Sequence, residues 1–479
     1  MRRIVYFWSA LTIAGTLIGW QLFVPPIIGL ADQGDFLRML GPAGYAPVPS
    51  GPEHKYWYLT TKFVQDPSYR QPRWEQASSE SLIVWTALAA NRIIGDQRSF
   101  DLRLIGFFHA LMLLLGLARL LHTTRHLRLY WLIWFLAVLA LTDVGYVAYL
   151  NSLYTEPASL VWFVFFVAET IHIATAKQVT VAAISRWTVF AVLWIAAKIQ
   201  NAPLCLPVAV FGVLIWHRTT RNAVRRVLVA GNVAILCAGG AMYQSLLPAP
   251  QVMATYDAIF FGMLPESPEP QIDLLALGLD PAYSRYSGTV AWSPGAGVAD
   301  GALVRSLQEN VNPAKIMWFY IMRPARLQEH VRTALISALS LRPEFCGNYD
   351  VSADKPPGAR SETLSLWSRF HSRCLARIGG FLVCYLFMFV MFGGALLFRL
   401  YKYDHARRRW IEFGILIAFC CLVSFVVPAF GDAWDNTKHQ FMFNLSLDTF
   451  LIFAVAVTIN YCLPSLKNQA NLPAPPDRL

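Results

Sequence analysis

Long apolar segments constrain this chain more than any other feature of its sequence. A helix needs about 20 mostly apolar residues to cross the hydrocarbon core of a membrane. Ten stretches approach that length, namely 4–24, 101–121, 129–150, 156–176, 185–200, 202–217, 227–247, 375–398, 410–430 and 443–463. Hydrophobic residues make up 56% of the chain and charged ones 14%, which excludes a disordered chain and an ordinary soluble domain. The sequence therefore predicts an all-α polytopic membrane protein with about ten transmembrane helices.

The fifth and sixth segments are short and are separated by Asn201-Ala202-Pro203. They form either two spans or one re-entrant pair, and both alternatives leave the sidedness of later loops unchanged. The first segment follows Arg2 and Arg3 as a signal peptide would, but it is long and no small-residue cleavage site follows it. We predict that it is retained as the first span.

The formal net charge of +11 is distributed unevenly among the connections between these segments. Alternate connections contain only two acids, Asp404 and Asp477, beside a much larger set of basic residues. That set is Arg2, Arg3, Arg125, Arg128, Lys177, Arg186, Arg218, Arg221, Arg225, Arg226, Arg399, Lys402, Arg407, Arg408, Arg409, Lys467 and Arg478. Because loops rich in Lys and Arg stay in the cytoplasm, we predict that both termini are cytoplasmic.

This topology divides the chain into two membrane modules and a long outward segment. The predicted units are an N-terminal module, 1–247, with a first outer loop at 31–100; an extracytoplasmic segment, 248–374; a C-terminal module, 375–466; and a cytoplasmic tail, 467–479.

Two further helices are expected outside the predicted spans, in the loop 31–100 and in the segment 248–374. We call these the first and second outward segments. The apolar stretch Glu80–Asn91 is short, and counting it as a span would place the basic clusters outside. We predict a helix lying in the outer interface, anchored by Trp74 and Trp85. An amphipathic helix is expected at 313–341.

Six of the eight cysteines lie in or beside apolar segments, where cysteine acts as a small apolar residue. Cys346 and Cys374 lie in the outward segment. The sequence leaves open whether these two form a disulfide in an oxidising compartment or remain thiols.

Several motifs are absent. The chain has no phosphate-binding loop of the form G-x-x-x-x-G-K-[ST] and no G-x-G-x-x-G, so ATP-driven transport and Rossmann cofactor binding lack support. It has no H-E-x-x-H and no paired C-x-x-C, which removes the usual zinc signatures. The basic residues lie in short loops beside the membrane, so nucleic acid is not an expected partner, whereas membrane lipids are.

Polar residues gather where the apolar segments reach the predicted outer side. They are Asp32, Asp35, Asp143, Asn151, Glu156, Lys198, Asp432, Lys438 and His439. Ionisable groups near hydrocarbon are costly and point to function by default. Structural roles remain as alternatives: a helix-dipole partner for Glu156, snorkelling for Lys198, and solvated loop positions for Asp432 and Asp435.

Five short stretches together resemble the GT-C glycosyltransferases, and more narrowly the bacterial membrane proteins called glycan-biosynthesis hexose transferases. The stretches are Gly34-Asp-Phe-Leu-Arg38, Tyr149-Leu-Asn-Ser-Leu-Tyr-Thr-Glu-Pro157, Lys198-Ile-Gln-Asn-Ala-Pro203, Leu277-Gly-Leu-Asp-Pro281 and Lys438-His-Gln-Phe-Met-Phe-Asn444. The acid at the start of the first outer loop, the interfacial helix and the large outer segment fit the same resemblance. It implies a GT-C-like fold.

The resemblance also implies a reaction and its location. A hexose would pass from a polyprenyl-phosphate donor to a cell-surface glycan or lipid-linked acceptor, on the outer face of the bacterial inner membrane. An acceptor hydroxyl needs a general base, and by the resemblance this base is Asp35, with Asp32 next. The residues expected to bind the donor phosphate are Lys198, Lys438, His439 and Arg38, and those expected to bind acceptor or sugar are Asp143, Asn151, Glu156 and Asp432.

A metal ion is left open by the sequence. Some GT-C relatives bind a divalent metal, and Asp32 and Asp35 are the residues that would hold Mg²⁺ or Mn²⁺ here. Nothing else in the sequence completes such a site.

Other functions compete with glycosyl transfer. A transporter or flippase for lipid-linked sugars would show inverted repeats and broken helices with polar groups at the midplane, and no internal repeat is found. A polysaccharide polymerase or ligase would share the topology and the lipid-linked substrates. A non-catalytic assembly partner would leave the outer acids unexplained.

Overall fold

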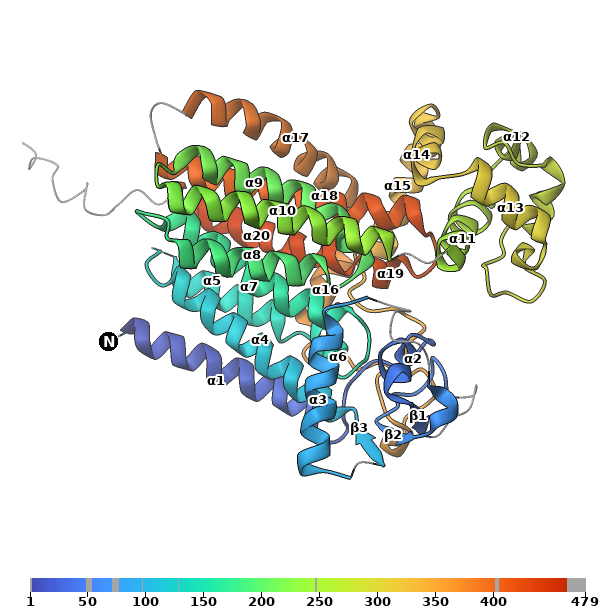
Figure 1. Ribbon diagram of the computed structural model, residues 1–479, viewed down its shortest axis with the longest axis horizontal. Helices are drawn as coiled ribbons and strands as arrows, with labels where there is room; N and C mark the ends of the chain where they lie inside the picture. Colours follow the sequence, from blue (N-terminus) through green and yellow to red (C-terminus); the bar gives the residue numbers. More distant parts are fainter. Residues whose placement is uncertain are drawn as a thin grey trace, which may run out of the picture.

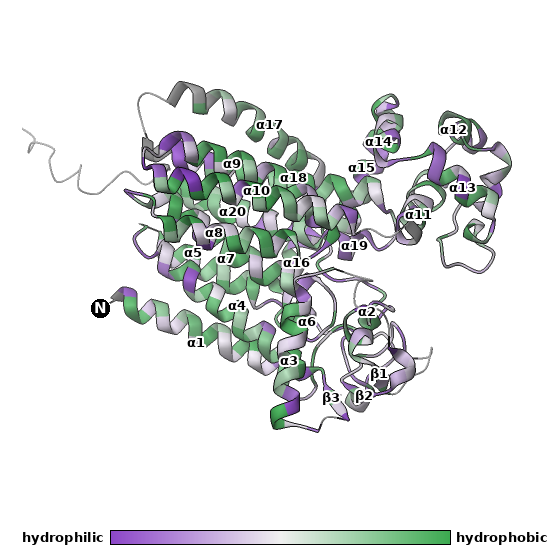
Figure 2. Ribbon diagram, in the orientation of Figure 1, coloured by the Kyte–Doolittle hydropathy of each residue, from purple (hydrophilic) through white to green (hydrophobic). Residues whose placement is uncertain are grey.

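The computed structural model describes residues 2–48, 54–70, 77–96, 98–127, 129–245, 248–400 and 405–462. Long helices lie side by side in one bundle (Figure 1), and hydrophobic residues cover most of their length (Figure 2). The bundle helices are α1 (Arg2–Phe23), α4 (Arg103–Thr124), α5 (Tyr130–Leu141), α6 (Val144–Leu150), α7 (Glu156–Thr175), α8 (Val181–Ile195), α9 (Cys205–Arg218), α10 (Asn222–Gln244), α17 (Ala376–Leu400), α18 (His405–Gly431) and α20 (Phe441–Cys462).

Each apolar segment predicted from the sequence overlaps one or two of these helices. Within the described residues, eight helices are long and apolar enough to cross a membrane, or nine if the bent pair α5 and α6 is one span. α8, with 15 residues, is a shorter apolar helix. The prediction of a helical polytopic membrane protein is confirmed, while the number of spans stays a prediction.

The predicted segment 129–150 is not one straight helix. α5 and α6 are bent by 59° at their junction. Asp143 leaves the helical region there, with φ −66° and ψ 139°, and its carboxylate accepts the Gly145 N–H to start α6. An Asp side chain that satisfies a free N–H in this way favours the start of a new helix.

The turn between α8 and α9 is formed by a short 3-10 helix, Ile199–Leu204, that continues into α9. The Asn201 amide donates to the Trp194 carbonyl at 2.9 Å and to the Ser159 hydroxyl at 3.1 Å. These bonds hold the turn against α7 at the end of the bundle where the outward segments lie (Figure 1).

The first outward segment contains a small sheet that the sequence did not predict. Strands β1 (Tyr45–Val48), β2 (Lys62–Gln65) and β3 (Ser99–Asp101) pair antiparallel in the order β1-β2-β3. Phe63 pairs with Phe100, and the Tyr45 ring lies 6.0 Å from the Phe100 ring. Strands of three or four residues show too little alternation to be recognised in a sequence.

The predicted helix at 80–91 is confirmed as α3 (Glu80–Ile94), which runs across the end of the bundle rather than along it (Figure 1). Its buried Glu80 places one carboxylate oxygen 2.8 Å from His109 of α4. The other oxygen accepts the Ala158 N–H of α7. The predicted anchor Trp74 lies outside the described residues.

The second outward segment is mostly short helices. They are α11 (Pro248–Tyr256), a π-helix (Asp257–Met263), α12 (Pro270–Ala276), α13 (Gly301–Asn310), α14 (Pro313–Ile321), α15 (Pro324–Ala338) and α16 (Leu366–Phe370). Of these, α11, α12, α13 and α14 stand off the end of the bundle in Figure 1, while α15 and α16 pack against it. The predicted single helix at 313–341 is wrong, because the helix breaks between α14 and α15. Arg323 takes φ −133° and ψ 74°, since a residue before proline is driven out of the helical region.

The two outward cysteines are not joined in the structure: Cys346 is a buried free thiol and Cys374 an exposed one. Several sequence predictions fall on residues outside the described ranges. These are the tail 467–479 and the basic residues Arg128 and Lys402.

The predicted orientation can be tested with alkaline phosphatase, which is active only outside the cytoplasm. Fused after Gly288, an open turn of the second outward segment, the enzyme should be active. Fused after Arg221, in the connection before α10, it should be inactive, because loops rich in Lys and Arg stay in the cytoplasm. The reverse pattern would overturn the orientation and the assignment of the outer face.

Candidate active site

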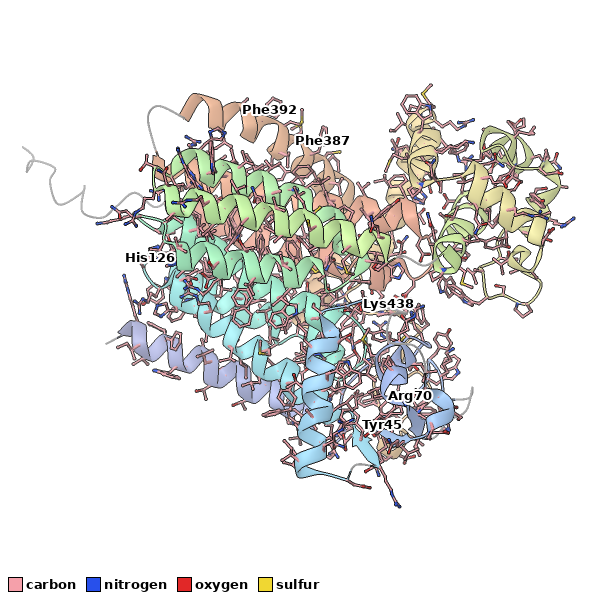
Figure 3. The ribbon with its side chains drawn as sticks, viewed as in Figure 1. Tyr45, Arg70, His126, Phe387, Phe392 and Lys438 are labelled. Carbon is pink, nitrogen blue, oxygen red and sulfur yellow. The ribbon has the colours of Figure 1, made fainter. Side chains whose placement is uncertain are left out.

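A buried lysine lies where the bundle meets both outward segments (Figure 3). Lys438 belongs to the single turn α19 (Asn436–His439) between α18 and α20, and its side chain is 4% exposed. Its ammonium lies 2.8 Å from Asp35 Oδ2 and 2.9 Å from Asp435 Oδ2. It also lies 4.8 Å from the centre of the Tyr154 ring, a favourable cation–π distance. The charge is therefore held by two carboxylates and one aromatic face.

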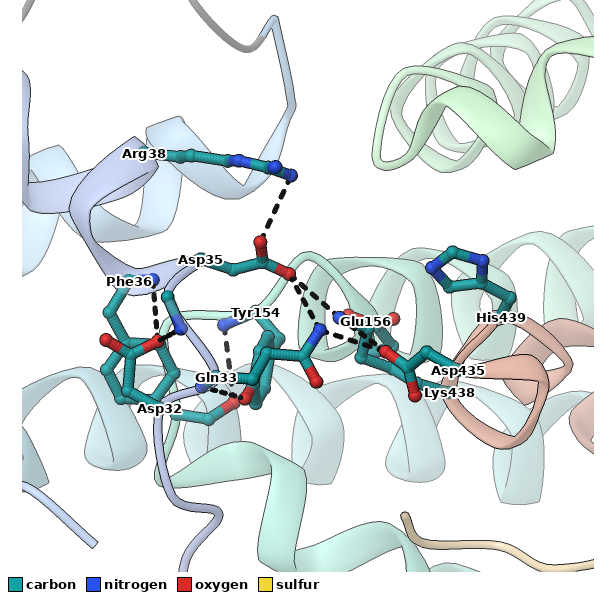
Figure 4. Close-up of polar contacts among 12 residues, drawn as sticks. Asp32, Gln33, Asp35, Phe36, Arg38, Tyr154, Glu156, Asp435, Lys438 and His439 are labelled. Atoms are coloured by element: carbon teal, nitrogen blue, oxygen red, sulfur yellow. Dashed lines mark hydrogen bonds and ion pairs between the residues drawn. The ribbon is translucent and has the colours of Figure 1, made fainter. Parts of the chain in front are cut away.

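Gln33 and Arg38 complete the immediate surroundings of Asp35 (Figure 4). The Gln33 amide donates to Asp435 Oδ2 at 2.9 Å and to Asp35 Oδ2 at 3.3 Å. Arg38 lies 3.2 Å from Asp35 Oδ1 and is about half exposed. The Asp35 side chain is 23% exposed, so it is the carboxylate of this group that a substrate can reach.

The two carboxylates beside Lys438 differ in charge behaviour. Burial raises the pKa of Asp35, but the charges of Lys438 and Arg38 outweigh burial and bring it well below its usual range. Burial raises the pKa of Asp435 above its usual range even though Lys438 opposes this. Burial lowers the pKa of Lys438, and the two carboxylates more than reverse that. Asp35 is therefore ionised near neutral pH and pairs with the ammonium.

The backbone of Asp435 is also unusual. It lies in the left-handed region, with φ 55° and ψ 30°, at the start of α19. Asp tolerates this region better than most residues, and non-glycine residues held there gather at functional sites. In this conformation Asp435 turns its carboxylate toward Lys438.

A second ion pair lies next to the first. Lys198 Nζ is 2.5 Å from Glu156 Oε1, and both side chains are buried. The pair lines a small cavity together with Gln200, Ser424 and His439. Gln200 Oε1, Ser424 Oγ and His439 Nδ1 have no hydrogen-bond partner among the described residues. A polar cavity with unused donors and acceptors is suited to a polar ligand group.

The sequence named most of the residues that meet here. Asp35, Arg38 and Lys438 are in direct contact, and Glu156, Lys198 and His439 line the adjoining cavity. Burial lowers the pKa of His439 well below its usual range, and the charges of Lys198 and Lys438 add to this. His439 is therefore a neutral donor or acceptor at neutral pH, and its role at the donor phosphate stays a prediction.

Three predicted residues have structural partners instead. Asp32 Oδ1 accepts the N–H groups of Gly34 and Phe36, which shapes the turn that presents Asp35. Asp143 accepts the N–H groups of Trp367 and Ser368. The Asn151 amide donates to the carbonyls of Leu22 and Ile28. None of the three contacts Lys438 in the described structure, and their roles in the reaction stay predictions.

Asp432 lies at the rim of this region. One of its oxygens accepts the Trp434 N–H, and the other lies 3.5 Å from His439 Nδ1.

Asp435, which the sequence left as a solvated loop alternative, is 2% exposed at its side chain and is part of the site. Gln33 and Tyr154 were also missed, although Tyr154 lies in a stretch that carries the resemblance and Gln33 directly precedes another.

Asp32 and Asp35 are the residues expected to hold a metal ion, and both have protein partners in the structure. Within the described residues, no three His, Cys, Asp or Glu side chains gather as a metal ion would need. Asp32 Oδ1 is bonded to backbone N–H groups, and Asp35 Oδ2 to Lys438. The Mg²⁺ or Mn²⁺ expectation therefore stays a prediction, and no step below depends on it.

A strip of aromatic rings extends from the site over the outward segments. The Trp434 ring lies 5.2 Å from Phe261, 5.6 Å from Trp292 and 6.1 Å from Phe345, with the last ring stacked on it. Tyr56 lies 6.0 Å beyond Phe345. Trp292 is 51% exposed. We call these five residues the aromatic strip; it begins one residue before Asp435.

Two further carboxyls near this strip, those of Asp257 and Asp432, influence each other electrostatically. Asp257, in the π-helix, accepts the Ala291 N–H through Oδ1, and its Oδ2 is buried without a partner. Burial raises the pKa of Asp257 to about 7. Burial also raises the pKa of Asp432 well above its usual range, and the nearby carboxyls of Asp257 and Asp435 add to this.

The long apolar helices define a multi-pass membrane protein, and a buried charged site lies at one end of their bundle. A model of the family described as the YfdI N-terminal transmembrane domain matches residues 3–472, and the chain belongs to this family. No curated protein matches it in sequence.

Solved structures resemble the chain only distantly. The archaeal oligosaccharyltransferase AglB from Archaeoglobus fulgidus, in complex with an inhibitory peptide and a dolichol-phosphate, is 14% identical, with a TM-score of 0.41 over 98% of this chain and 52% of that one. The Archaeoglobus fulgidus oligosaccharyltransferase tethered to an acceptor peptide is 12% identical, with a TM-score of 0.37 over 95% and 50%. This chain spans about half the length of these structures.

The raised pKa of Asp257 makes stability depend on pH. The folded state holds this proton up to about pH 7, whereas an unfolded Asp releases it near pH 4. Asp257 therefore destabilises the fold increasingly as pH rises from about 4 to 7. Asp257→Asn keeps the acceptor for Ala291, and its advantage over the wild type in thermal unfolding should grow between pH 5 and 8 by on the order of 2 kcal/mol.

The control is Asp280→Asn, which changes an exposed carboxyl of the same outward segment. Its difference from the wild type should stay constant over the same pH range. An Asp257→Asn advantage that does not change with pH would show that Asp257 is ionised in the folded protein throughout.

Proposed function

We propose that this chain transfers a hexose from a polyprenyl-phosphate donor to a cell-surface glycan or lipid-linked acceptor, at the outer face of a bacterial inner membrane. The observation that carries the proposal is the buried Lys438 with the partly exposed Asp35 against it. An anion-binding cation and a reachable carboxylate are the two groups that this reaction needs. The sequence resemblance to GT-C glycosyltransferases supports the same conclusion.

Lys438 is proposed to bind the donor phosphate. The sugar–phosphate linkage of the donor carries one negative charge, and a second charge develops on the phosphate as its bond to the anomeric carbon breaks. Cations fixed in a low-dielectric site stabilise such developing charge strongly. Lys198 lies in the adjoining cavity and Arg38 at the exposed edge, so the leaving phosphate meets positive charge from either side.

Asp35 is proposed to act as the general base. Its pKa lies below the usual range because Lys438 pairs with it, and a base this weak accepts a proton poorly. When the donor phosphate takes a share of the Lys438 charge, the Asp35 pKa rises toward that of an ordinary carboxyl. The acceptor oxygen then attacks the anomeric carbon, its proton passes to Asp35, and polyprenyl phosphate leaves with the electrons of the broken bond.

The aromatic strip is proposed to hold the acceptor. Faces of sugar rings carry C–H groups that pack on aromatic rings, whose faces are electron-rich. Trp434 is covalently adjacent to Asp435, and its ring neighbours come from the outward segments. The donor tail must lie among the spans, so the donor and acceptor approach Asp35 from opposite sides.

Asp35→Asn is the direct test of the base. The amide keeps the size of the carboxylate but cannot take the proton, so release of polyprenyl phosphate from polyprenyl-phosphate hexoses should fall about 10²- to 10⁴-fold. Binding of polyprenyl phosphate should remain. The matched control, Asp280→Asn, should keep full activity, because Asp280 is exposed and caps a distant turn.

Full activity of Asp35→Asn would remove Asp35 from the chemistry. Movement of lipid-linked sugar across vesicles without any release of polyprenyl phosphate would favour the transporter alternative. Transfer of a whole glycan in place of a single hexose would favour a polymerase or ligase.

Trp434→Ala tests the acceptor side. Loss of the central ring of the strip should raise the KM for the acceptor about tenfold or more, since ring contacts of this kind contribute about 1 kcal/mol or more each. The KM for the donor should change little. Trp318→Ala is the control, because Trp318 is an exposed tryptophan of α14 outside the strip. Equal effects on donor and acceptor would contradict the assignment.

A further inference from the structure

A cavity of about 530 Å³ lies at the end of the bundle opposite to Lys438. It opens between the start of α1 and the junction of α4 with α5, near His126 in Figure 3. Four basic side chains line it: Arg3 from α1, and His122, Arg125 and His126 from the end of α4 and the turn after it. The proposed glycosyl transfer uses none of them.

The charge of this cavity is not neutralised by the protein. Among the described residues, neither arginine of the cavity forms an ion pair with a carboxylate; Arg3 instead lies 5.2 Å from the centre of the Tyr130 ring. Two other arginines do have a carboxylate partner, because Glu169 pairs with both Arg119 and Arg186. Two permanent cations lining an open cavity favour an anion, and the planar guanidinium groups suit a phosphate in particular.

The rest of the cavity wall is apolar. Phe7 and Trp134 pack edge to face at 6.3 Å, and the Trp134 N–H is already used by the Thr124 hydroxyl. Trp8, 62% exposed, lines the same cavity. Ile4 lines the cavity as well and is exposed, and Ile13 is another exposed apolar side chain farther along α1. A free phosphate ion would gain nothing from these surfaces, whereas an acyl chain would bury them.

We infer that this cavity is a binding site for an anionic phospholipid. The phosphate of the lipid lies between Arg3 and Arg125, and its acyl chains lie along α1, past Trp8. Basic pockets between transmembrane helices bind anionic headgroups in this manner, and tryptophans at the same depth are typical of the membrane interface. The bound lipid joins α1 to the turn after α4, and so stabilises the first helix of the bundle.

The test measures lipid binding to the purified full-length protein and does not depend on glycosyl transfer. Dioleoylphosphatidylglycerol should bind saturably and raise the unfolding temperature, and dioleoylphosphatidylcholine should do neither. The double variant Arg3→Gln/Arg125→Gln should weaken phosphatidylglycerol binding at least about tenfold, as loss of charge-assisted hydrogen bonds predicts. The double variant Arg221→Gln/Arg226→Gln removes the same charge at the start of α10 and should bind as the wild type does.

Other outcomes would overturn the site. Equal loss in both double variants would mean that phosphatidylglycerol responds only to overall charge. Equal stabilisation by inorganic phosphate would make the site one for phosphate and not for lipid. Should the Arg3→Gln/Arg125→Gln protein fail to fold, Trp8→Ala decides: it removes part of the acyl-chain wall and should weaken phosphatidylglycerol binding, and unchanged binding would contradict the proposal.

Discussion

The structure of the candidate site depends on one buried ammonium group. Taking a lysine charge out of water costs several kcal/mol unless opposite charge lies close to it. Asp35, at the start of the first outward segment, and Asp435, in the last loop, together supply that charge at 2.8 and 2.9 Å. The contact between Lys438 and Asp35 joins residues 403 positions apart. This contact therefore joins the segment after α1 to the loop between α18 and α20.

Other long-range polar contacts make a framework around this pair. Asp143 binds the backbone at Trp367 and Ser368, and the Asn348 amide donates to the Gly29 carbonyl. Each contact ties the second outward segment to the membrane helices or to the chain that leaves α1. A carboxylate or amide that satisfies buried backbone groups is costly to remove. Asp143 and Asn348 therefore stabilise the fold around the site.

The helices could be predicted from the sequence because their length and apolar character are imposed by the membrane itself. Asp35, Lys438, Lys198 and Glu156 were also found from the sequence, since charged residues at span ends are conspicuous. The break before Pro324 was missed, although the proline was a usable signal. The small sheet had no such signal, because its strands have three or four residues.

No sequence pattern could predict which partner each charged side chain of the site bonds to. Asp32 and Asp35 are three residues apart and chemically identical, yet one bonds to backbone N–H groups and the other to Lys438. Likewise Asp435 is buried at the site while Asp432 lies at its rim. These differences arise from the backbone conformation of one or two residues, such as the left-handed conformation of Asp435. The sequence does not show such conformations.

In the proposed reaction, Lys438 gives up part of its bond with Asp35 to bind the donor phosphate. The most direct measurement is a cryo-EM structure of the full chain with a bound polyprenyl phosphate. We expect a phosphate oxygen within about 3 Å of Lys438 Nζ, with Asp35 freed to face the aromatic strip. A phosphate bound away from Lys438, with the Lys438–Asp35 ion pair unchanged, would contradict it.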